Sequence, residues 1–175
     1  MINIPIDSSL ALRQVTEDDA EPIFRLINAS RVHLNAWLPF VKNTKGSHDT
    51  LAYIQSTLRD GPKCLVCSIV ENGQIVGMCG FNEISEANKS ASMGYWIGVP
   101  FRGRGIMERA VNALVDFGFS QIGLNRIAIS CATGNFRSAN VAVKCGFLLE
   151  GVSREAECIN GVFVDHQNYS RLRND

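Results

Sequence analysis

The sequence predicts a mixed α/β domain with a mostly antiparallel sheet of about seven strands, one parallel central pair and flanking helices. About seven segments have the alternating or continuously apolar pattern of strands. An amphipathic helical pattern over 106–119 connects two of them, 91–99 and 126–131, and such a crossover makes its strands parallel. Asn72-Gly73 and Asn160-Gly161 are typical of hairpin turns, which predicts antiparallel pairing elsewhere.

The first third of the chain is predicted to form one strand and two helices. A strand over 10–15 precedes Thr16, which can cap a helix whose first turn is acidic. Residues 31–46 are expected to be irregular or a short helix. Ser47 can cap a second helix, which should end at Gly61-Pro62.

The remainder is predicted to form two hairpins around the crossover unit, with a short helix that ends at Cys145-Gly146. Ligands of such a unit lie beyond the carboxyl ends of its strands, so residues 133–138 should lie opposite the loop after Val99. The strands and helices expected here are 63–71, 74–82, 91–99, 106–119, 126–131, 138–144, 147–159 and 162–172.

Length and charge limit the functional classes. A chain of 175 residues is expected to form a single domain over 1–175. Its 17 basic and 17 acidic residues balance, which argues against a nucleic acid or an anionic membrane as partner. No apolar run is long enough to span a membrane and no secretion signal is apparent, so a cytoplasmic location is expected.

Six cysteines are scattered along the chain, mostly within apolar runs. Cys64 and Cys67 have the spacing of a metal or redox pair. On a strand, residues three apart point to opposite faces, so these thiols cannot share one ion. No metal site is expected.

The most informative segment is the glycine-rich turn Arg102-Gly103-Arg104-Gly105-Ile106, between a predicted strand and a predicted helix. Such a turn brings main-chain N–H groups close to a ligand, and the helix N-terminus adds further donors. The chain has no Walker sequence, and Glu108 occupies the third glycine position of a dinucleotide fingerprint. The segment is therefore interpreted as a pyrophosphate site, with an ordinary surface turn as the alternative.

The order of these motifs resembles the GCN5-related N-acetyltransferases (GNAT) over nearly the whole chain. The family pattern [QR]-x-x-G-x-[GA] is matched by Arg102 and Gly105, while Met107 replaces the usual small residue. The Gly-Ile-Met continuation is similar to the ribosomal-protein-serine N-terminal acetyltransferases of the RimL and RimJ type. Further strings resemble that branch: Phe81-Asn82, Asn88-Lys89, Gly94-Tyr95-Trp96, Leu149-Glu150-Gly151, Ala156-Glu157 and Asn160-Gly161.

The resemblance implies that acetyl-CoA is the co-substrate and assigns residues to it. Backbone groups of Ile97 and Val99 would bond the pantetheine arm, and Asn135 would hydrogen-bond the same arm. Main-chain amides would hold the pyrophosphate at Arg102, Gly103, Arg104, Gly105, Ile106 and Met107.

Ser138 and Glu157 are the catalytic candidates that the resemblance implies. Ser138 would stabilise charge on the leaving sulfur, and as an alternative or in addition it would cap the short helix after it. Glu157 would act as general base through a water, unless it is only a solvated carboxylate near a hairpin tip. Many GNAT enzymes have a glutamate where this chain has Met93, so Glu83 is the second candidate base.

The resemblance implies transfer of acetyl to the N-terminal α-amine of a protein such as a ribosomal protein, by a homodimer. An α-amine, with a pKa of about 7.7–8.0, is more readily deprotonated than lysine. The alternatives are a small-amine acceptor (an amino sugar, a polyamine or an amine toxin) and a binding module that senses acetyl-CoA without turnover. Trp37 is interpreted as lining an acceptor groove, packing in the core or forming a lid hinge.

Overall fold

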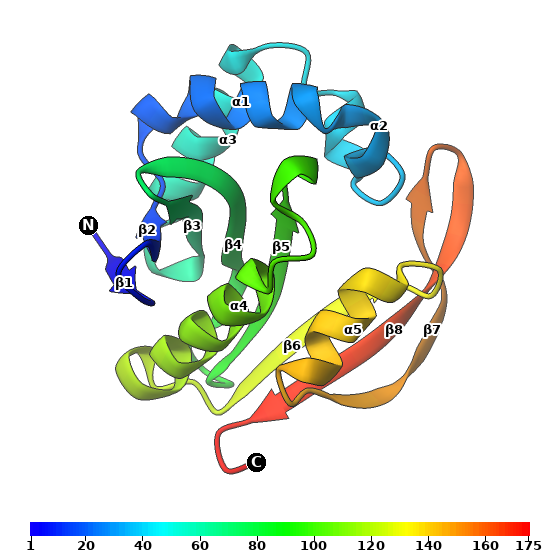
Figure 1. The fold of residues 1–175 in the computed structure, drawn as a ribbon. Coiled ribbons are helices and arrows are strands. Elements are labelled where there is room, and N and C mark those ends of the chain that lie inside the picture. Colours follow the sequence, from blue (N-terminus) through cyan, green and yellow to red (C-terminus); the bar gives the residue numbers. More distant parts are fainter.

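The structure, a computed structural model, describes residues 1–175 and forms an eight-stranded sheet in the order β1-β2-β3-β4-β5-β6-β8-β7 (Figure 1). Only β5 and β6 pair in parallel, which confirms the predicted fold class. The strands are β1 Asn3–Pro5, β2 Leu10–Gln14, β3 Leu65–Glu71, β4 Gln74–Ser85, β5 Ser90–Ile97, β6 Arg126–Ala132, β7 Leu148–Ile159 and β8 Val162–Leu172.

Five α-helices cover the sheet: α1 Ala20–Ala29, α2 Arg31–Leu34, α3 Ser47–Asp60, α4 Ile106–Phe117 and α5 Phe136–Lys144. The strand β1 was not predicted, because three residues are too few to show an alternating pattern; it pairs with β2 at the sheet edge. The helix expected over 106–119 ends at Phe117 and continues as one π-helical turn, Gly118–Ile122. No helix is long and apolar enough to cross a membrane.

The two sheet faces carry separate cores. Cys67 and Cys79 belong to the larger core, which includes α4 and α5. Their neighbours Val66 and Met78 belong to a smaller core under α1 and α3. This division follows from the alternation of side chains along a strand. Figure 1 shows α4 and α5 on one side of the sheet and α1 and α3 on the other.

Strands β5 and β6 pair over only part of their length. Their register runs from Ser90 opposite Arg126 to Met93 opposite Ile129, and beyond these residues the two strands no longer pair with each other. A bulge between Phe81 and Glu83 in β4 adds local twist next to this point. The two strands therefore diverge, as Figure 1 shows, and leave an opening in the middle of the sheet.

The register shows which backbone groups face this opening. The N–H of Gly98 donates to the carbonyl of Val76 (2.9 Å), so even-numbered residues of β5 bond to β4. Because backbone direction alternates along a strand, Tyr95 and Ile97 direct their N–H and C=O groups to the other side. These groups lie beyond the last β5–β6 pair and have no strand partner.

Two predicted helix caps are wrong by one and three residues. The N-cap of α3 is Gly46, and Ser47 is the first helical residue; the Asp49 carboxylate accepts the N–H groups of Lys45 (2.8 Å) and Gly46 (3.0 Å).

The N-cap of α5 is Asn135, and Ser138 lies in the first turn. The Asn135 Oδ1 accepts the N–H of Ser138 (3.3 Å), so Ser138 is not the cap. Asparagine and serine are comparable caps, and the sequence alone does not choose between them.

Candidate active site

The turn before α4 exposes a row of main-chain donors. Gly103 and Gly105 have φ angles of +73° and +68°, a left-handed conformation that favours glycine. From Gly103 to Glu108, no main-chain N–H donates a hydrogen bond to any group of the protein. Consecutive free donors at a helix N-terminus form an anion site, because the helix dipole adds to the local positive potential. The turn has the geometry that a diphosphate requires.

The two arginines of this turn have different partners. Arg104 pairs with the Glu71 carboxylate (Nη2 to Oε1, 2.9 Å), which offsets part of its charge. Arg102 lies beside Arg137 instead, and burial and the neighbouring charge lower its pKa. Burial and these two guanidinium groups also lower the pKa of His33.

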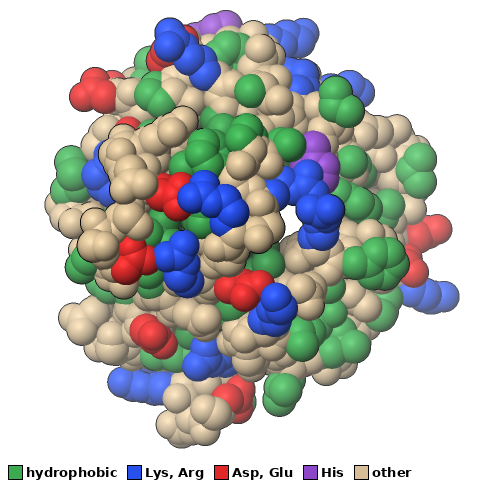
Figure 2. Space-filling view, in the orientation of Figure 1, with side chains coloured by type: hydrophobic (Ala, Val, Ile, Leu, Met, Phe, Trp, Pro, Cys, Tyr) green, Lys and Arg blue, Asp and Glu red, His purple; other side chains and the backbone are tan.

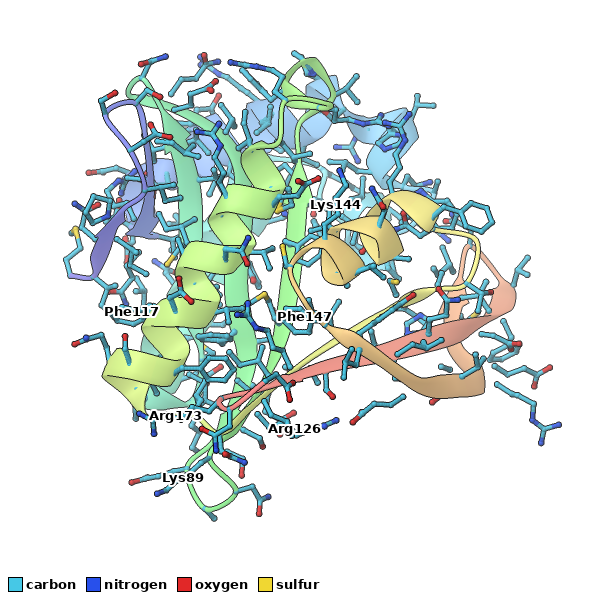
Figure 3. All side chains as sticks on the ribbon, turned by 60° about the horizontal axis from the view of Figure 1, so that its bottom comes forward. Lys89, Phe117, Arg126, Lys144, Phe147 and Arg173 are labelled. Carbon is cyan, nitrogen blue, oxygen red and sulfur yellow. The ribbon has the colours of Figure 1, made fainter.

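These basic side chains surround a cavity of about 410 Å³, which the turn also lines. Figure 2 shows a hollow in the middle of this face with lysine and arginine side chains at its rim. Lys144 lies between α5 and α4 (Figure 3), where it pairs with Glu108 (2.8 Å). The cavity therefore combines main-chain donors with positive charge, as a coenzyme A nucleotide requires.

A second cavity of about 670 Å³ adjoins the first. Both cavities are lined by Trp37, Leu38, Tyr95, Trp96, Asn135 and Ser138. A molecule held by its phosphates in the smaller cavity could thus extend to a junction where a second molecule meets it. Trp37 lies at this junction, in agreement with the first interpretation of this residue, a place in the lining of a groove.

Two hydroxyl groups lie at the junction. The Ser138 Oγ donates to the Tyr95 hydroxyl (3.2 Å), which donates to the Ser138 carbonyl (3.0 Å). Burial raises the pKa of Tyr95, against a smaller opposing effect of the Ser138 hydrogen bond, so the phenol keeps its proton. Tyr95 was recognised only as part of a family string, because nothing in the sequence indicates that residues 43 apart would meet.

Glu157 lies in the lining of the larger cavity, next to His166. The two side chains are joined by a hydrogen bond between Oε2 and Nε2 (3.1 Å). Glu83, the second candidate base, lines neither cavity.

The backbone positions expected to hold the pantetheine arm have different environments. Ile97 pairs with Gly77 of β4 on one side, while its N–H and C=O face the opening and have no partner on β6. The N–H of Val99 donates to the Ser30 Oγ (3.0 Å), in a 3-10 turn over Val99–Phe101, and is not free. The register makes Tyr95, rather than Val99, the second backbone position on the open side.

The other positions of the predicted set lie around the same junction. The side chains of Ile106 and Met107 are buried in the larger core, so both offer a ligand only their N–H groups. A long side chain at position 107 is therefore compatible with the site. Asn135 uses Oδ1 as a helix cap, which leaves its Nδ2 for a ligand.

The larger cavity is mainly apolar. Hydrophobic residues form 16 of its 29 lining positions. Its two carboxylates are Glu157 and Asp49, and Asp49 already accepts two main-chain N–H groups. No group of three or more histidine, cysteine, aspartate or glutamate side chains lies close enough to hold a metal ion.

Comparison with known proteins relates this geometry to a reaction. Residues 9–148 match the acetyltransferase (GNAT) domain family. The ribosomal-protein-serine acetyltransferase of Escherichia coli (strain K12) is 31% identical, over 97% of this chain and 96% of that protein.

Two solved structures with the same fold contain coenzyme A or acetyl-CoA. RimL, a ribosomal L7/L12 α-N-protein acetyltransferase in complex with coenzyme A, has a TM-score of 0.93 and 28% identity, over 98% of both chains. The microcin C7 self-immunity acetyltransferase MccE, in complex with acetyl-CoA and AMP, has a TM-score of 0.91 and 32% identity, over 95% and 94%.

Proposed function

The chain belongs to the GNAT acetyltransferases, and on that premise we propose that it acetylates the N-terminal α-amine of a protein, with a ribosomal protein as the acceptor class. Acetyl-CoA is the acetyl donor. One observation carries the proposal: the free donors from Gly103 to Glu108 lie in a cavity that meets, at Ser138, a second cavity lined by Glu157. The site thus has separate places for a nucleotide and an amine.

The residues of the turn and of β5 bind and orient the donor. N–H groups from Gly103 to Glu108 hold the diphosphate, and Arg102 and Arg137 add charge beside it. Backbone groups of Tyr95 and Ile97 bond the pantetheine arm as an added strand would. The Nδ2 of Asn135 donates to the same arm.

Catalysis requires a neutral amine and stabilisation of the departing thiolate. Glu157 accepts a proton from the acceptor ammonium, directly or through a water. Ser138 donates a hydrogen bond to the sulfur as negative charge develops on it, and the Tyr95 hydroxyl holds Ser138 in place. Glu157 lies in β7 and Ser138 in α5, so regular secondary structure holds both catalytic groups and little reorganisation is needed.

The acceptor cavity favours one amine over a polyamine. A polycation needs several carboxylates, whereas the lining has two: Asp49 already accepts two main-chain N–H groups, and Glu157 has only Oε1 without a partner. A peptide N-terminus carries one ammonium followed by a neutral backbone. Its first side chains would contact Trp37, Tyr53 and Trp96.

The likeness to RimL-type enzymes extends the proposal to partners. We propose a homodimer that acts in the cytoplasm, where ribosomal acceptors are available, without nucleic acid as a ligand. Light scattering of the purified protein at micromolar concentration tests the dimer, and a monomer at every concentration would contradict it.

Thiol release from acetyl-CoA tests the main proposal. Peptides with free N-termini should support turnover, while the same peptides blocked at the N-terminus but containing lysine should not. Spermidine and amino sugars form the comparison panel. Turnover with a small amine alone would replace the proposed acceptor, and binding of acetyl-CoA without turnover of any amine would identify a binding module.

A further inference from the structure

His166 lies on the same sheet face as Glu157 because of the strand register. On β8, His166 is opposite Ser153, and Val164, two residues away, is opposite Glu157. Residues two apart on a strand share a face, so Glu157 and His166 form a diagonal cross-strand pair. Both residues line the larger cavity.

A bulge in β7 sets this arrangement. Between the two pairs, four residue steps on β7 (153 to 157) match two steps on β8 (166 to 164), so β7 has two extra residues. Glu155 lies in the bulge with a φ of +49°, and its N–H donates to the Asp165 Oδ1 (2.8 Å). The Asp165 carbonyl accepts the N–H of Thr133 (2.9 Å), which attaches the hairpin to the end of β6. The backbone is thus fixed without any contribution from the Glu157–His166 hydrogen bond.

Neither side chain makes a hydrogen bond to any other group of the protein. Glu157 is 37% exposed and His166 is 16% exposed, so the imidazole is the more enclosed of the two. A carboxylate that serves as a base only accepts hydrogen bonds, so in the proposed role of Glu157 the donor of this bond is the His166 Nε2. The bond occupies Oε2 and leaves Oε1 of Glu157 for the acceptor.

We propose that His166 is a positioning residue for the acyl transfer, which holds Glu157 with Oε1 toward the acceptor amine. This inference rests on the proposed function. A half-exposed glutamate has several rotamers of similar energy, and one hydrogen bond from an enclosed imidazole selects one of them. The pair would thereby offer a base in a fixed position before the acceptor arrives.

Glu157 accepts one proton in the proposed reaction. The acceptor ammonium gives one proton to Oε1 of Glu157, which passes it to solvent. The neutral amine then adds to the thioester carbonyl carbon and forms the C–N bond. As the C–S bond breaks, the sulfur leaves with the electron pair and takes the second proton of the nitrogen, so free thiol and amide are the products. His166 keeps its proton throughout.

Four variants test the proposal in the full-length enzyme: His166→Ala, His166→Gln, Glu157→Gln and the double variant His166→Ala with Glu157→Gln. Glutamine at 166 places an amide donor near the position of Nε2 but cannot act as a base. Asn168→Ala is the matched control: Asn168 lies on the same strand and face, donates to Ser153 (2.8 Å) and accepts from Ser130 (2.7 Å), and does not itself line the acceptor cavity.

His166→Ala should lower kcat about tenfold or more, while the KM for acetyl-CoA stays within about twofold of the original value. His166→Gln should recover kcat to within about threefold, and Asn168→Ala should leave it unchanged. In the Glu157→Gln background, His166→Ala should have no further effect, because the carboxylate that it positions is absent.

Three results would overturn the proposal. If His166→Gln is as slow as His166→Ala, the imidazole acts through its proton transfer and not through position. If His166→Ala slows the Glu157→Gln enzyme by the same factor as the original enzyme, the two residues act independently. An unchanged kcat in His166→Ala would show that His166 has no role in catalysis. A different outcome, an original enzyme that binds acetyl-CoA but acetylates no amine, would refute the proposed function itself.

Discussion

Ser138 has little acidity of its own, so its contribution depends on its neighbour. The Tyr95 phenol, protonated because burial raises its pKa, accepts the Ser138 hydroxyl at 3.2 Å and returns a hydrogen bond to the Ser138 carbonyl. This exchange of hydrogen bonds between β5 and α5 fixes a hydroxyl at the junction of the two cavities. The protein thereby places a donor where charge develops on the leaving sulfur.

Removal of this hydroxyl should affect turnover more than binding. For Ser138→Ala we expect kcat to fall about tenfold or more, with a smaller change in the acetyl-CoA KM, because the lost bond forms mainly with the thiolate. Tyr95→Phe should lower kcat less, since it removes only the hydroxyl that holds the Ser138 side chain in place. Steady-state thiol release measures both, and an unchanged kcat for Ser138→Ala would return Ser138 to a structural role.

Glu157→Gln should have a pH-dependent effect. The variant lacks a base, so its rate should be reduced most at low pH and recover partly as pH rises. The recovery follows the acceptor, because an α-amine becomes neutral as pH passes its ordinary pKa of about 7.7–8.0. A pH profile of kcat/KM measures this, and a loss of constant size at all pH values would argue against a base.

At the scale of elements, the glycine turn and α4 together form the nucleotide site. Gly105 is the N-cap of α4 at φ +68°, and Gly123 ends the π-helical turn after the same helix at φ +79°. A Cβ at either position would meet no atom within 4 Å. Both positions therefore require a left-handed backbone, but Gly105 precedes α4, whereas Gly123 follows the π-helical turn beyond its far end.

Gly105→Ala and Gly123→Ala should lose similar stability and different affinity. Each places alanine in a left-handed conformation, which costs about 1 kcal/mol of unfolding free energy. Only Gly105→Ala should weaken coenzyme A binding, because it distorts the row of free donors. Urea unfolding and calorimetry with coenzyme A measure the two effects, and equal affinity in both variants would remove the turn from the site.

An ion pair connects β6 to β7 across β8. Arg126 donates to both carboxylate oxygens of Glu150 (2.7 and 2.6 Å), and Ser170 of β8 donates to Oε1 (2.8 Å). Hydrogen bonds from Arg126, then from Ser170, lower the pKa of Glu150 from 4.5 to about 2. Figure 3 shows Arg126 at the end of the molecule opposite Lys144, remote from the site.

This pair should stabilise the protein above pH 4.5 and lose its effect as pH falls toward 2. The folded-state pKa is the lower one, so the folded state binds fewer protons between these values and acid favours unfolding. Since both side chains are more than a third exposed, Glu150→Gln should cost only about 0.5–1 kcal/mol at pH 7. Urea unfolding at pH 7 and pH 3 measures the difference, and a constant difference at both pH values would contradict the assignment.

Local patterns in the sequence predict most elements, because α4 and the hairpins have strong periodicity and Asn-Gly turns. They predict less well where two residues compete for one role, as Asn135 and Ser138 do for the N-cap of α5. The turn at 102–106 can be predicted from the sequence because its two glycines, Gly103 and Gly105, occupy positions where the backbone has a positive φ. The Tyr95–Ser138 and Glu157–His166 contacts join separate strands or helices, and no local pattern encodes them.

At the scale of the whole molecule, the site exists because the sheet separates into two parts. β1 to β5 form one part and β6 to β8 the other, and the register between them stops at Met93 and Ile129. A ligand held by the turn at Gly103 to Glu108 and by the backbone of β5 would fill the opening between them. Binding should then protect backbone amides of β5 that have no partner in the free protein.

Hydrogen–deuterium exchange can distinguish the contacts of the two parts of coenzyme A, the pantetheine arm and the nucleotide. Coenzyme A should slow exchange of the N–H groups of Tyr95 and Ile97 as well as those from Gly103 to Glu108, since its pantetheine arm would accept hydrogen bonds along β5. Adenosine 3′,5′-bisphosphate has no pantetheine arm, so at saturation it should protect only the turn. The N–H of Gly98, which already bonds the Val76 carbonyl, is an internal control that neither ligand should change directly. Protection of Tyr95 and Ile97 by both ligands alike would mean that closure of the sheet, and not an added strand, slows their exchange.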